Sequence, residues 1–458
     1  MLLKVVSGQN PREIAVEILG KAAVGRWEQR KTPDLQGAIN PLEGPAGQAF
    51  VEDLLERALA KGRLPPADRG LCQELVYGVV RWQAALDWLI SQKTRGPSPK
   101  PSLQNILRLG LYQIFWLNRI PNHAAVNETV EIAKRKGFKS QAGFINAVLR
   151  GYLREYEITQ VKLRELDQVD PALRHSHPQW LFERWRRTWG EENARRLMEW
   201  NNQPPKTFAR INSLKADPGK VLATWRDENV DYDFVRQDWL EENIVFVLKS
   251  HPPFSALASF RQGLFYLQDP STLLAVRELD PHPGEAILDL CAAPGGKLTF
   301  IAQLLKNEGK LVAYDTNPSR LKLIEENCAR LGVTCVKTIS AEGLSNRQDW
   351  MFDRILVDAP CSNTGVMRRR VDLRWRIREE EIIRLQTMQI ELLRQAALLL
   401  RPGGNLIYST CSLEPEENDQ VIERFVAEQP AFQIVKRRQL LPWVERVDGA
   451  YVANLRRK

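Results

Sequence analysis

The chain has 458 residues, of which 43% are hydrophobic and 26% are charged, a balance that is ordinary for globular domains. This length predicts two or three domains. The formal net charge is +9, and the excess is N-terminal: residues 1–150 contain 21 Lys and Arg against 13 Asp and Glu, whereas the remainder contains 44 against 43. Such a basic segment indicates either a polyanionic partner or a merely solvated surface.

The cysteine pattern and the hydropathy argue against two classes of protein. The six cysteines have neither CxxC pairs nor the spacing of a zinc site, so we expect reduced thiols, no metal and a cytoplasmic location. The first residues are too polar for a signal peptide. The most apolar helical stretch, residues 390–400, contains Glu391 and Arg394 and is far shorter than the ~20 residues that span a bilayer. We therefore expect a soluble protein with no disulfide scaffold.

The first third of the chain has the periodicity of helices. Apolar residues recur at helical spacing, and stretches rich in proline and glycine separate the runs. The pattern predicts helices over residues 11–23, 50–60, 67–80, 81–92, 102–118, 123–136 and 141–155. No alternation typical of strands interrupts them, so we expect an all-α domain over residues 1–158.

Residues 159–265 have a mixed pattern. A helical run over 178–201 is rich in tryptophan and arginine, and a strand pattern follows at 207–212. A helix pattern at 217–228 and a second strand pattern at 243–248 come next. These elements predict a small α+β module.

From about residue 266 strands and helices alternate. The pattern predicts strands at 286–290, 310–314, 333–338, 354–358 and 404–409, and helices at 297–306, 318–331, 379–400 and 415–427. Alternation of this kind is typical of a parallel sheet with helices on both faces. We therefore expect an α/β Rossmann-like domain over residues 266–458.

The first of these strands runs into a glycine turn that suits a cofactor. The turn comprises Cys291, Ala292, Ala293, Pro294, Gly295, Gly296 and Lys297, and its two glycines let the backbone approach a ligand closely. Asp315 ends the next strand, where a carboxylate suits ribose hydroxyls. The turn matches neither G-x-G-x-x-G nor the triphosphate loop G-x-x-x-x-G-K-[ST]. S-adenosylmethionine is therefore favoured over NAD, and glycines that only turn a corner remain the alternative.

Two further strand ends carry cysteines. Cys361 follows Asp358-Ala359-Pro360, and Cys411 follows Ser409-Thr410. Because ligands lie beyond the carboxyl ends of parallel strands, we expect both thiols in the same crevice as the glycine turn. A thiolate there can add to C6 of a pyrimidine and make C5 nucleophilic toward a sulfonium methyl group. The chemistry alone leaves open which cysteine is the nucleophile.

Asp358 and a run of arginines lie beside Cys361. Asp358 is suited to bonding a base edge or moving a proton, with a structural cap as the alternative. Residues 363–378 contain six arginines and one tryptophan, and we expect RNA contacts from Arg368, Arg369, Arg370 and Arg374. A solvated charged face is the alternative here. Because a base must leave its stack to reach a thiol, a single-stranded or loop nucleotide is expected.

Several of these segments resemble known families. LDLCAAPGGK, DAPCSNTGVMRRRVDLRW and LIYSTCSLEPEEN resemble the RNA cytosine-C5 methyltransferases. The N-terminal segments DRGLCQELVYGVVRW, LRLGLYQIFWLNRIPNHAAVNETVEIAK and GFINAVLR resemble the helical NusB-type RNA-binding domain. This combination is similar to the bacterial members that modify small-subunit rRNA. The resemblance implies methylation of C5 of a cytosine in 16S rRNA, with S-adenosylmethionine as cofactor and a covalent Cys–C6 adduct. It also implies that the α+β module over residues 159–265 contributes to RNA recognition. A monomer is expected.

The resemblance also implies roles for single residues. Cys411 matches the family's nucleophile, and Cys361 matches the cysteine thought to aid product release. The 291–297 turn and Asp315 match the cofactor site. Asp358 matches the acidic residue between the cofactor and the cytosine.

Two positions and the substrate stay open. The DNA cytosine methyltransferases carry their nucleophile in a Pro-Cys motif like Pro360-Cys361, so the order of the two thiols needs a test. The acid that usually contacts the adenine follows the third strand, where this chain has Ser340; either Ser340 bonds the adenine amine or Glu342 replaces it. The competing functions are a tRNA cytosine-C5 methyltransferase and a non-catalytic, NusB-like RNA-binding or antitermination factor.

Overall fold

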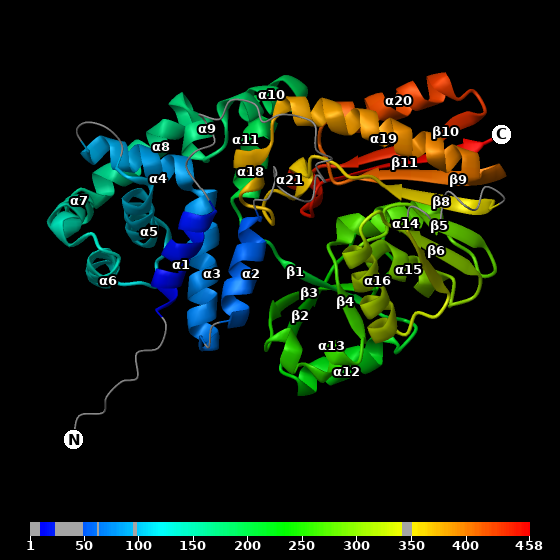
Figure 1. Ribbon diagram of the computed structural model, residues 1–458, viewed down its shortest axis with the longest axis horizontal. Helices are drawn as coiled ribbons and strands as arrows, with labels where there is room; N and C mark the ends of the chain where they lie inside the picture. Colours follow the sequence, from blue (N-terminus) through cyan, green and yellow to red (C-terminus); the bar gives the residue numbers. More distant parts are fainter. Residues whose placement is uncertain (1–9, 23–48, 62–63, 95–98, 341–349) are drawn as a thin grey trace. The chain divides into compact units, whose positions relative to one another are not determined.

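The computed structural model describes residues 10–22, 49–61, 64–94, 99–340 and 350–458. These residues pack into two compact units (Figure 1). The first unit is Met1–Gln203 together with Met367–Ile377, and the second is Pro204–Val366 together with Arg378–Lys458. The chain therefore passes from one unit to the other at three points.

The first unit is helical, as the periodicity predicts. Its helices are α1 (Pro11–Lys21), α2 (Val51–Lys61), α3 (Pro66–Arg81), α4 (Gln83–Lys93), α5 (Pro101–Trp116), α6 (Asn122–Arg135), α7 (Ala142–Arg154), α8 (Tyr156–Val169), α9 (Pro171–Arg174), α10 (Gln179–Trp189), α11 (Glu191–Asn201) and α18 (Leu373–Arg376). Proline at the first position starts several of them, and the Asn10 side chain caps α1 by accepting from Arg12 N–H at 2.9 Å.

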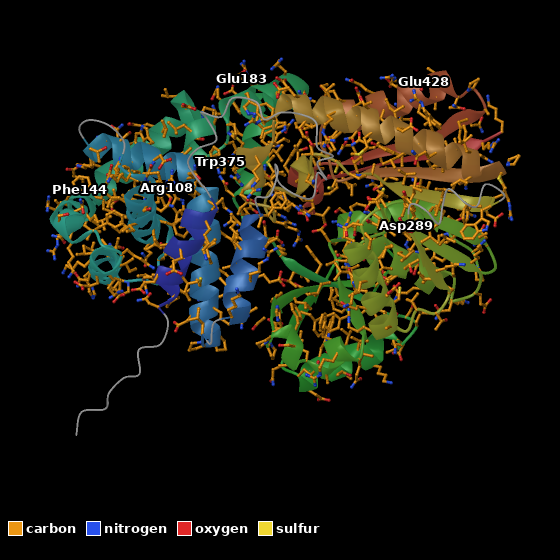
Figure 2. The ribbon with its side chains drawn as sticks, in the orientation of Figure 1. Arg108, Phe144, Glu183, Asp289, Trp375 and Glu428 are labelled. Atoms are coloured by element: carbon orange, nitrogen blue, oxygen red, sulfur yellow. The ribbon has the colours of Figure 1, made fainter. Side chains whose placement is uncertain are left out.

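The core of this unit is apolar, but it also holds buried charged side chains. Leu107, Leu109 and Leu111 of α5 are fully buried, as expected for the central helix of a bundle. Arg108 on the same helix is also buried, and its Nη2 pairs with Asp87 Oδ2 of α4 at 2.6 Å (Figure 2). The pair satisfies a charge that would otherwise be costly to bury.

The helical run expected over 178–201 is two helices. Gly190 separates α10 from α11 with φ +81°, a left-handed value that glycine adopts readily. Helix α8 lies just beyond the last helix that we predicted in the N-terminal third.

The division between the units does not coincide with the domain boundaries expected at residues 158 and 265. Residues 159–203 pack with the first unit, where Ala85 N–H on α4 donates to Ser176 Oγ at 2.9 Å. The second unit then begins at Pro204 and takes in the small sheet as well as the large one. The three-domain boundaries therefore stay a prediction.

A four-stranded antiparallel sheet opens the second unit. Its order is β2-β3-β1-β4, from β1 (Thr207–Ile211), β2 (Asp231–Phe234), β3 (Val245–Ser250) and β4 (Phe265–Leu267). Helices α12 (Pro218–Asp227) and α13 (Ala258–Arg261) belong to the same module. Trp225 of α12 packs edge-on against Phe246 and Phe265 from the sheet. The α+β character predicted for this region is confirmed.

The second sheet has seven strands in the order β10-β11-β9-β8-β5-β6-β7. Its strands are β5 (Ala286–Asp289), β6 (Lys310–Tyr314), β7 (Val336–Ile339), β8 (Phe352–Asp358), β9 (Leu400–Thr410), β10 (Phe432–Leu440) and β11 (Ala450–Arg457). The five strands from β9 to β7 run parallel, and β11 and β10 extend the sheet antiparallel. The predicted Rossmann-like architecture is confirmed, with the antiparallel edge added.

Helices cover both faces of this sheet (Figure 1). They are α14 (Leu273–Leu279), α15 (Gly296–Leu304) and α16 (Pro318–Leu331) on one face, and α19 (Glu379–Leu399) and α20 (Asp419–Glu428) on the other. Successive residues of β5 serve the two faces: Ile287 packs with the α14–α16 cluster and Leu288 with the α19–α20 cluster. This alternation follows from the two-residue repeat of a strand.

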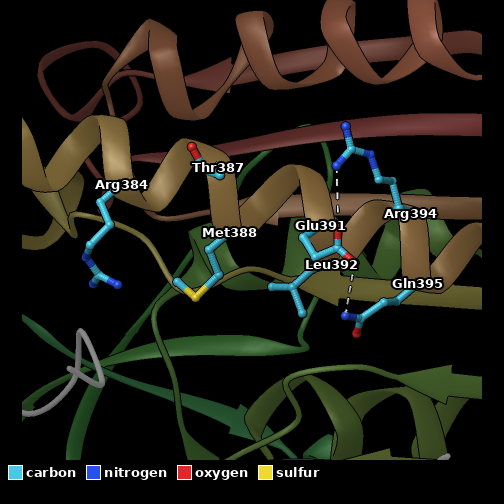
Figure 3. Close-up of a pocket in the computed structure, with 7 residues that line it drawn as sticks. All are labelled: Arg384, Thr387, Met388, Glu391, Leu392, Arg394 and Gln395. Atoms are coloured by element: carbon cyan, nitrogen blue, oxygen red, sulfur yellow. Dashed lines mark hydrogen bonds and ion pairs between the residues drawn. The ribbon is translucent and has the colours of Figure 1, made fainter. Parts of the chain in front are cut away.

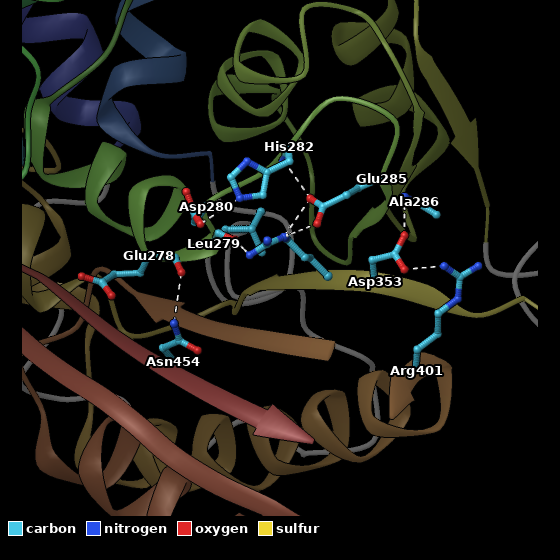
Figure 4. A network of polar contacts seen from close by, with 10 residues as sticks. Glu278, Leu279, Asp280, His282, Glu285, Ala286, Asp353, Arg401 and Asn454 are labelled. Atoms are coloured by element: carbon cyan, nitrogen blue, oxygen red, sulfur yellow. Dashed lines mark hydrogen bonds and ion pairs between the residues drawn. The ribbon is translucent and has the colours of Figure 1, made fainter. Parts of the chain in front are cut away.

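A polar network fastens β5 to β8 at their amino ends (Figure 4). Asp353 Oδ2 accepts from Ala286 N–H at 2.8 Å. Arg354 donates to Glu285 Oε2 at 2.8 Å and to the carbonyl of Leu279 at 2.6 Å. These contacts fix the two strands whose opposite ends carry the candidate site.

No helix among the residues described above has both the length and the apolar composition that crossing a lipid bilayer requires.

Candidate active site

The sheet order places the predicted site residues along one edge. From β5 the chain moves outward to β6 and β7, and it then crosses to β8 and β9 on the other side of β5. In open α/β sheets a ligand crevice forms where the winding reverses, beyond the carboxyl ends of the strands. The 291–297 turn follows the carboxyl end of β5, Asp315 follows that of β6, and Ser340 follows that of β7. Asp358 is the last residue of β8, Cys361 lies in the loop after β8, and Cys411 lies in the loop after β9.

The glycine turn is compact, and the side chains of Tyr266 and Gln268 pack against it. Gly295 has φ +100°, and its N–H donates to the Ala292 carbonyl at 2.8 Å. A Cβ atom at Gly296 would lie only 3.1 Å from Gln268 Nε2 and 3.2 Å from Tyr266 at β4. A larger residue at 296 would therefore press on these two side chains, and the positive φ at 295 is a value that glycine adopts readily.

Asp315 is a buried carboxylate at the end of β6. Its side chain is 3% exposed. Oδ1 accepts from the Asn317 N–H at 3.0 Å, and Oδ2 lies 3.2 Å from Arg320 Nη1. Since a carboxylate has about four acceptor positions, Asp315 keeps acceptor capacity for a ligand.

Helix α16 braces the glycine turn, which the sequence alone did not indicate. Arg320 Nη2 donates to the Ala293 carbonyl at 3.0 Å, and Asn327 Nδ2 donates to the Pro294 carbonyl at 3.0 Å. Arg320 thereby links Asp315 to the turn. Polar residues are common on the solvated face of any helix, so the sequence did not distinguish Arg320 and Asn327 from other polar residues of α16.

Ser340 lies immediately after β7 and is half-buried. It therefore lies just beyond the strand beside β6, and Asp315 lies just beyond β6 itself. The alternative adenine contact, Glu342, lies outside the described residues. The role of Ser340 stays a prediction.

Asp289, the last residue of β5, is buried (Figure 2). It is 1% exposed, and neither oxygen has a hydrogen-bond partner among the residues that the structure describes. Burial, reinforced by the Asp358 carboxylate, raises the pKa of Asp289 to about 8. In the sequence, Asp289 is distinguished only as part of a predicted strand.

We expect Asp289→Asn to remove a pH-dependent loss of stability. An aspartate of the unfolded chain ionises near pH 4, whereas Asp289 keeps its proton in the folded chain up to about pH 8. The wild-type free energy of unfolding should therefore fall by about 2 kcal/mol between pH 6 and pH 8 relative to that of the variant. Urea unfolding of the ligand-free protein at both pH values measures this.

The control for this prediction is Asp227→Asn, because Asp227 is exposed at the end of α12. Its stability should follow that of the wild type at both pH values. Parallel pH dependences for the wild type and Asp289→Asn would contradict the burial argument.

Lys297 and Asp358 form an ion pair between the turn and β8. Lys297 Nζ donates to Asp358 Oδ2 at 2.7 Å. Burial alone would lower the pKa of Lys297, but the Asp358 carboxylate outweighs it and raises that pKa. Lys297 thus stays charged and holds Asp358 next to the turn.

The structure brings the two cysteines together. Cys361 Sγ and Cys411 Sγ are 3.2 Å apart, and Cys411 Sγ lies 3.1 Å from Asn363 Oδ1. Cys361 is 4% exposed, whereas Cys411 is half-buried. The hydrogen bond with Cys411, together with burial, raises the pKa of the Cys361 thiol well above its ordinary value. A neutral Cys361 thiol can therefore donate to the Cys411 sulfur.

Two glycines allow the cysteine loops to approach each other. Gly365 N–H donates to the Cys411 carbonyl at 2.9 Å, and Gly449 N–H donates to the Gly365 carbonyl at 2.9 Å. A Cβ atom at Gly365 would lie 2.7 Å from the Cys411 oxygen and 2.8 Å from Gly449 Cα. The backbones could not come this close with side chains at these positions.

The structure contradicts two of the expected RNA contacts. Arg368 and Arg374 are 1% and 0% exposed. Arg374 Nη1 donates to Asn202 Oδ1 at 2.7 Å and its Nη2 donates to the Asn201 carbonyl at 3.0 Å, while the Arg368 guanidinium lies 4.1 Å from the Trp200 ring centroid. Both side chains are thus packed inside the first unit, because neutral acceptors and an aromatic face there replace water.

Arg369 and Arg370 are half-buried. The Arg370 guanidinium lies 5.5 Å from the Phe50 ring centroid. Their contacts with RNA stay a prediction.

Two surface hollows lie apart from the cysteines and the glycine turn. One, of about 600 Å³, runs along α19 beside Met388 and Leu392 (Figure 3). The other, of about 450 Å³, lies between α16 and β7. Neither is lined by residues that the sequence analysis placed in the site.

Family models match three parts of the chain. Residues 276–456 match "16S rRNA methyltransferase RsmB/F", and residues 9–154 match the NusB family. Residues 177–247 match the ferredoxin-like domain of the RsmF/B-like methyltransferases.

Whole-length relatives agree with these matches. The chain is 37% identical over 439 residues to a probable ribosomal RNA small subunit methyltransferase B of Bacillus subtilis, covering 90% of this chain and 95% of the relative. It is 35% identical over 433 residues to the ribosomal RNA small subunit methyltransferase B of Klebsiella pneumoniae, covering 89% and 97%. A solved methyltransferase homologue from Pyrococcus horikoshii superposes with a TM-score of 0.56 at 31% identity, covering 63% of this chain and 98% of that one.

Proposed function

The chain belongs to the 16S rRNA methyltransferase RsmB/F family, and from that premise we propose that it methylates C5 of a specific cytosine in 16S rRNA. The observation that carries the proposal is the pair of sulfur atoms 3.2 Å apart, Cys361 and Cys411, at the edge of the sheet that also carries the glycine turn. Two thiols in one crevice serve a reaction in which one adds to a base and the other assists its release.

The residues at the turn fit S-adenosylmethionine. Asp315 offers a buried carboxylate for ribose hydroxyls, and Ser340 directly follows the adjacent strand, where the adenine would lie. The cofactor is cationic, and its positive charge would favour the ionised form of Asp289, whose two oxygens have no partner among the described residues. The 291–297 turn supplies a close backbone approach without a long nest for phosphates.

Cys411 is the proposed nucleophile. Its thiolate adds to C6 of the cytosine, forming an S–C6 bond and moving an electron pair to C5. S-adenosylmethionine, when bound, supplies the methyl group to C5. A base then takes the C5 proton, the S–C6 bond breaks, and the electron pair returns to the sulfur.

Cys361 and Asp358 assist this cycle. The Cys361 thiol is buried and lies within hydrogen-bonding distance of the Cys411 sulfur, so it can deliver a proton to the departing thiolate. Asp358 is held by Lys297 at the end of β8, where a carboxylate suits the amino edge of a cytosine.

The proposed partner is 16S rRNA, bound as a single-stranded or loop segment by a monomeric, cytoplasmic enzyme. The base must be unstacked, because a thiol cannot reach C6 inside a duplex. The N-terminal unit would contribute through its excess of basic residues. The competing substrate is tRNA.

Bisulfite sequencing tests the proposal. Unmethylated 16S rRNA incubated with the enzyme and S-adenosylmethionine should acquire one cytosine that resists deamination, and tRNA should acquire none. A protected cytosine in tRNA alone would favour the tRNA enzyme. Absence of methylation together with no calorimetric binding of S-adenosylmethionine would favour the non-catalytic RNA-binding factor.

A further inference from the structure

Both cysteines are followed by a serine, and the two serines meet. Ser362 and Ser412 are 5% and 0% exposed, and their Oγ atoms are 3.0 Å apart. In each loop the cysteine is followed by a serine, so the two Sγ atoms face each other and the two Oγ atoms face each other.

A single carboxylate accepts hydrogen bonds from both serines. Glu417, in the turn Pro415–Glu417 before α20, is fully buried. Its Oε1 accepts from the Ser362 N–H at 2.8 Å, and its Oε2 accepts from Ser412 Oγ at 2.5 Å and from Ser362 Oγ. One side chain thus contacts both cysteine loops directly.

Helix α19 completes the arrangement. Gln389 Nε2 donates to Glu417 Oε1 at 3.0 Å and to the Pro360 carbonyl, next to Cys361, at 2.9 Å. Glu417 therefore accepts four hydrogen bonds from neutral groups. An uncharged amide could not accept all of them, because half of its polar head donates.

We propose that Glu417 is a positioning residue that holds the Cys361 and Cys411 loops at the separation that addition and release require, an inference that rests on the proposed function. Glu417 touches neither sulfur. It acts through the serines that follow them, and a small change in the geometry of reacting groups is costly to the rate.

Glu417→Gln tests the proposal, with Glu423→Gln as the matched control. The Glu423→Gln substitution removes the same charge from the exposed side of α20, where the Glu423 carboxylate pairs with Arg437. Glu417→Gln keeps the size of the side chain, but its amide N–H group would face the hydroxyl and N–H groups that donate to the Glu417 carboxylate in the wild type. We expect kcat to fall about tenfold or more, with KM for S-adenosylmethionine unchanged, and Glu423→Gln to behave as the wild type.

A second readout does not depend on methyl transfer. Diamide oxidises neighbouring thiols by taking up their two protons and two electrons, which leaves a disulfide. Once it is corrected for the thiolate fraction, taken from the pH dependence of the reaction, the rate of Cys361–Cys411 cross-linking reports how well the two sulfurs are held together. In Glu417→Gln this rate should fall about tenfold, whereas a residue that only supported the fold would lower the thermal midpoint and leave the rate per folded molecule unchanged.

The two assays separate the proposals. If the wild type methylates no RNA, the proposed function fails, and the cross-linking rate still tests the role of Glu417. Wild-type kcat and a wild-type cross-linking rate in Glu417→Gln would overturn the inference. If that variant does not fold, the double variant Ser362→Ala/Ser412→Ala replaces it, since it keeps Glu417 but removes both hydroxyl donors. Unchanged cross-linking in the double variant would equally overturn the inference.

Discussion

Replacement of Cys411 by alanine is expected to abolish methyl transfer to unmethylated 16S rRNA, with a loss in kcat on the order of a thousandfold or more. The substitution removes the only atom proposed to bond to C6, and without that bond C5 is a poor nucleophile. Transfer of tritium from labelled S-adenosylmethionine to the RNA measures the loss.

The control for this experiment is Cys335→Ala, since Cys335 is a half-buried thiol outside the proposed site. It should retain full activity. Cys411→Ala should still bind S-adenosylmethionine with wild-type affinity, because none of the proposed cofactor contacts involves position 411. Full turnover by Cys411→Ala would remove Cys411 from the mechanism.

Replacement of Cys361 by alanine is expected to trap the RNA on the enzyme. Addition through Cys411 would proceed, but release would lose the thiol that lies 3.2 Å from the Cys411 sulfur. A protein–RNA complex stable in SDS should accumulate to about tenfold the wild-type level or more. Gel electrophoresis with labelled RNA shows this complex directly.

The double variant Cys361→Ala/Cys411→Ala is the control, and it should form no complex. The experiment also decides the order of the thiols, which the residue chemistry left open. A stable complex in Cys411→Ala but not in Cys361→Ala would reverse the two roles and make Pro360-Cys361 the nucleophilic motif.

The regular elements could be predicted because each follows from local periodicity. The strand expected over 310–314 and the helix expected over 318–331 are β6 and α16 with the same bounds. The short strands β2 and β4 were missed because four and three residues carry too little alternation to stand out. Strand β10 was also missed, and its exposed middle residues obscure the pattern of a sheet strand.

The cysteines at the strand ends could be expected to meet, because parallel strands end at one edge of a sheet. The burial of Arg368 and Arg374 within the arginine run could not be predicted. Burial of Arg374 depends on Asn201 and Asn202, which lie more than 170 residues earlier in the chain. Without knowledge of such partners, a run of charged residues is expected to lie on the surface.

Glu417 escaped attention for a similar reason. It stands in the acidic sequence Glu414-Pro415-Glu416-Glu417, which is typical of the solvated first turn of a helix. Only the tertiary contacts with Ser362 and Ser412 distinguish it from its neighbours. The repeated Cys-Ser pair was the one signal in the sequence that could have suggested a shared partner.

The interruption of the second unit by Met367–Ile377 affects how the protein can be divided. The eleven residues begin six positions after Cys361, and they carry buried apolar side chains such as Val371 and Leu373 into the helical unit. No uninterrupted stretch of the gene therefore encodes either half intact. A fragment that starts at Pro204 would expose these side chains to water, so the methyl-transferring half is not an independent module that can be excised with a single cut.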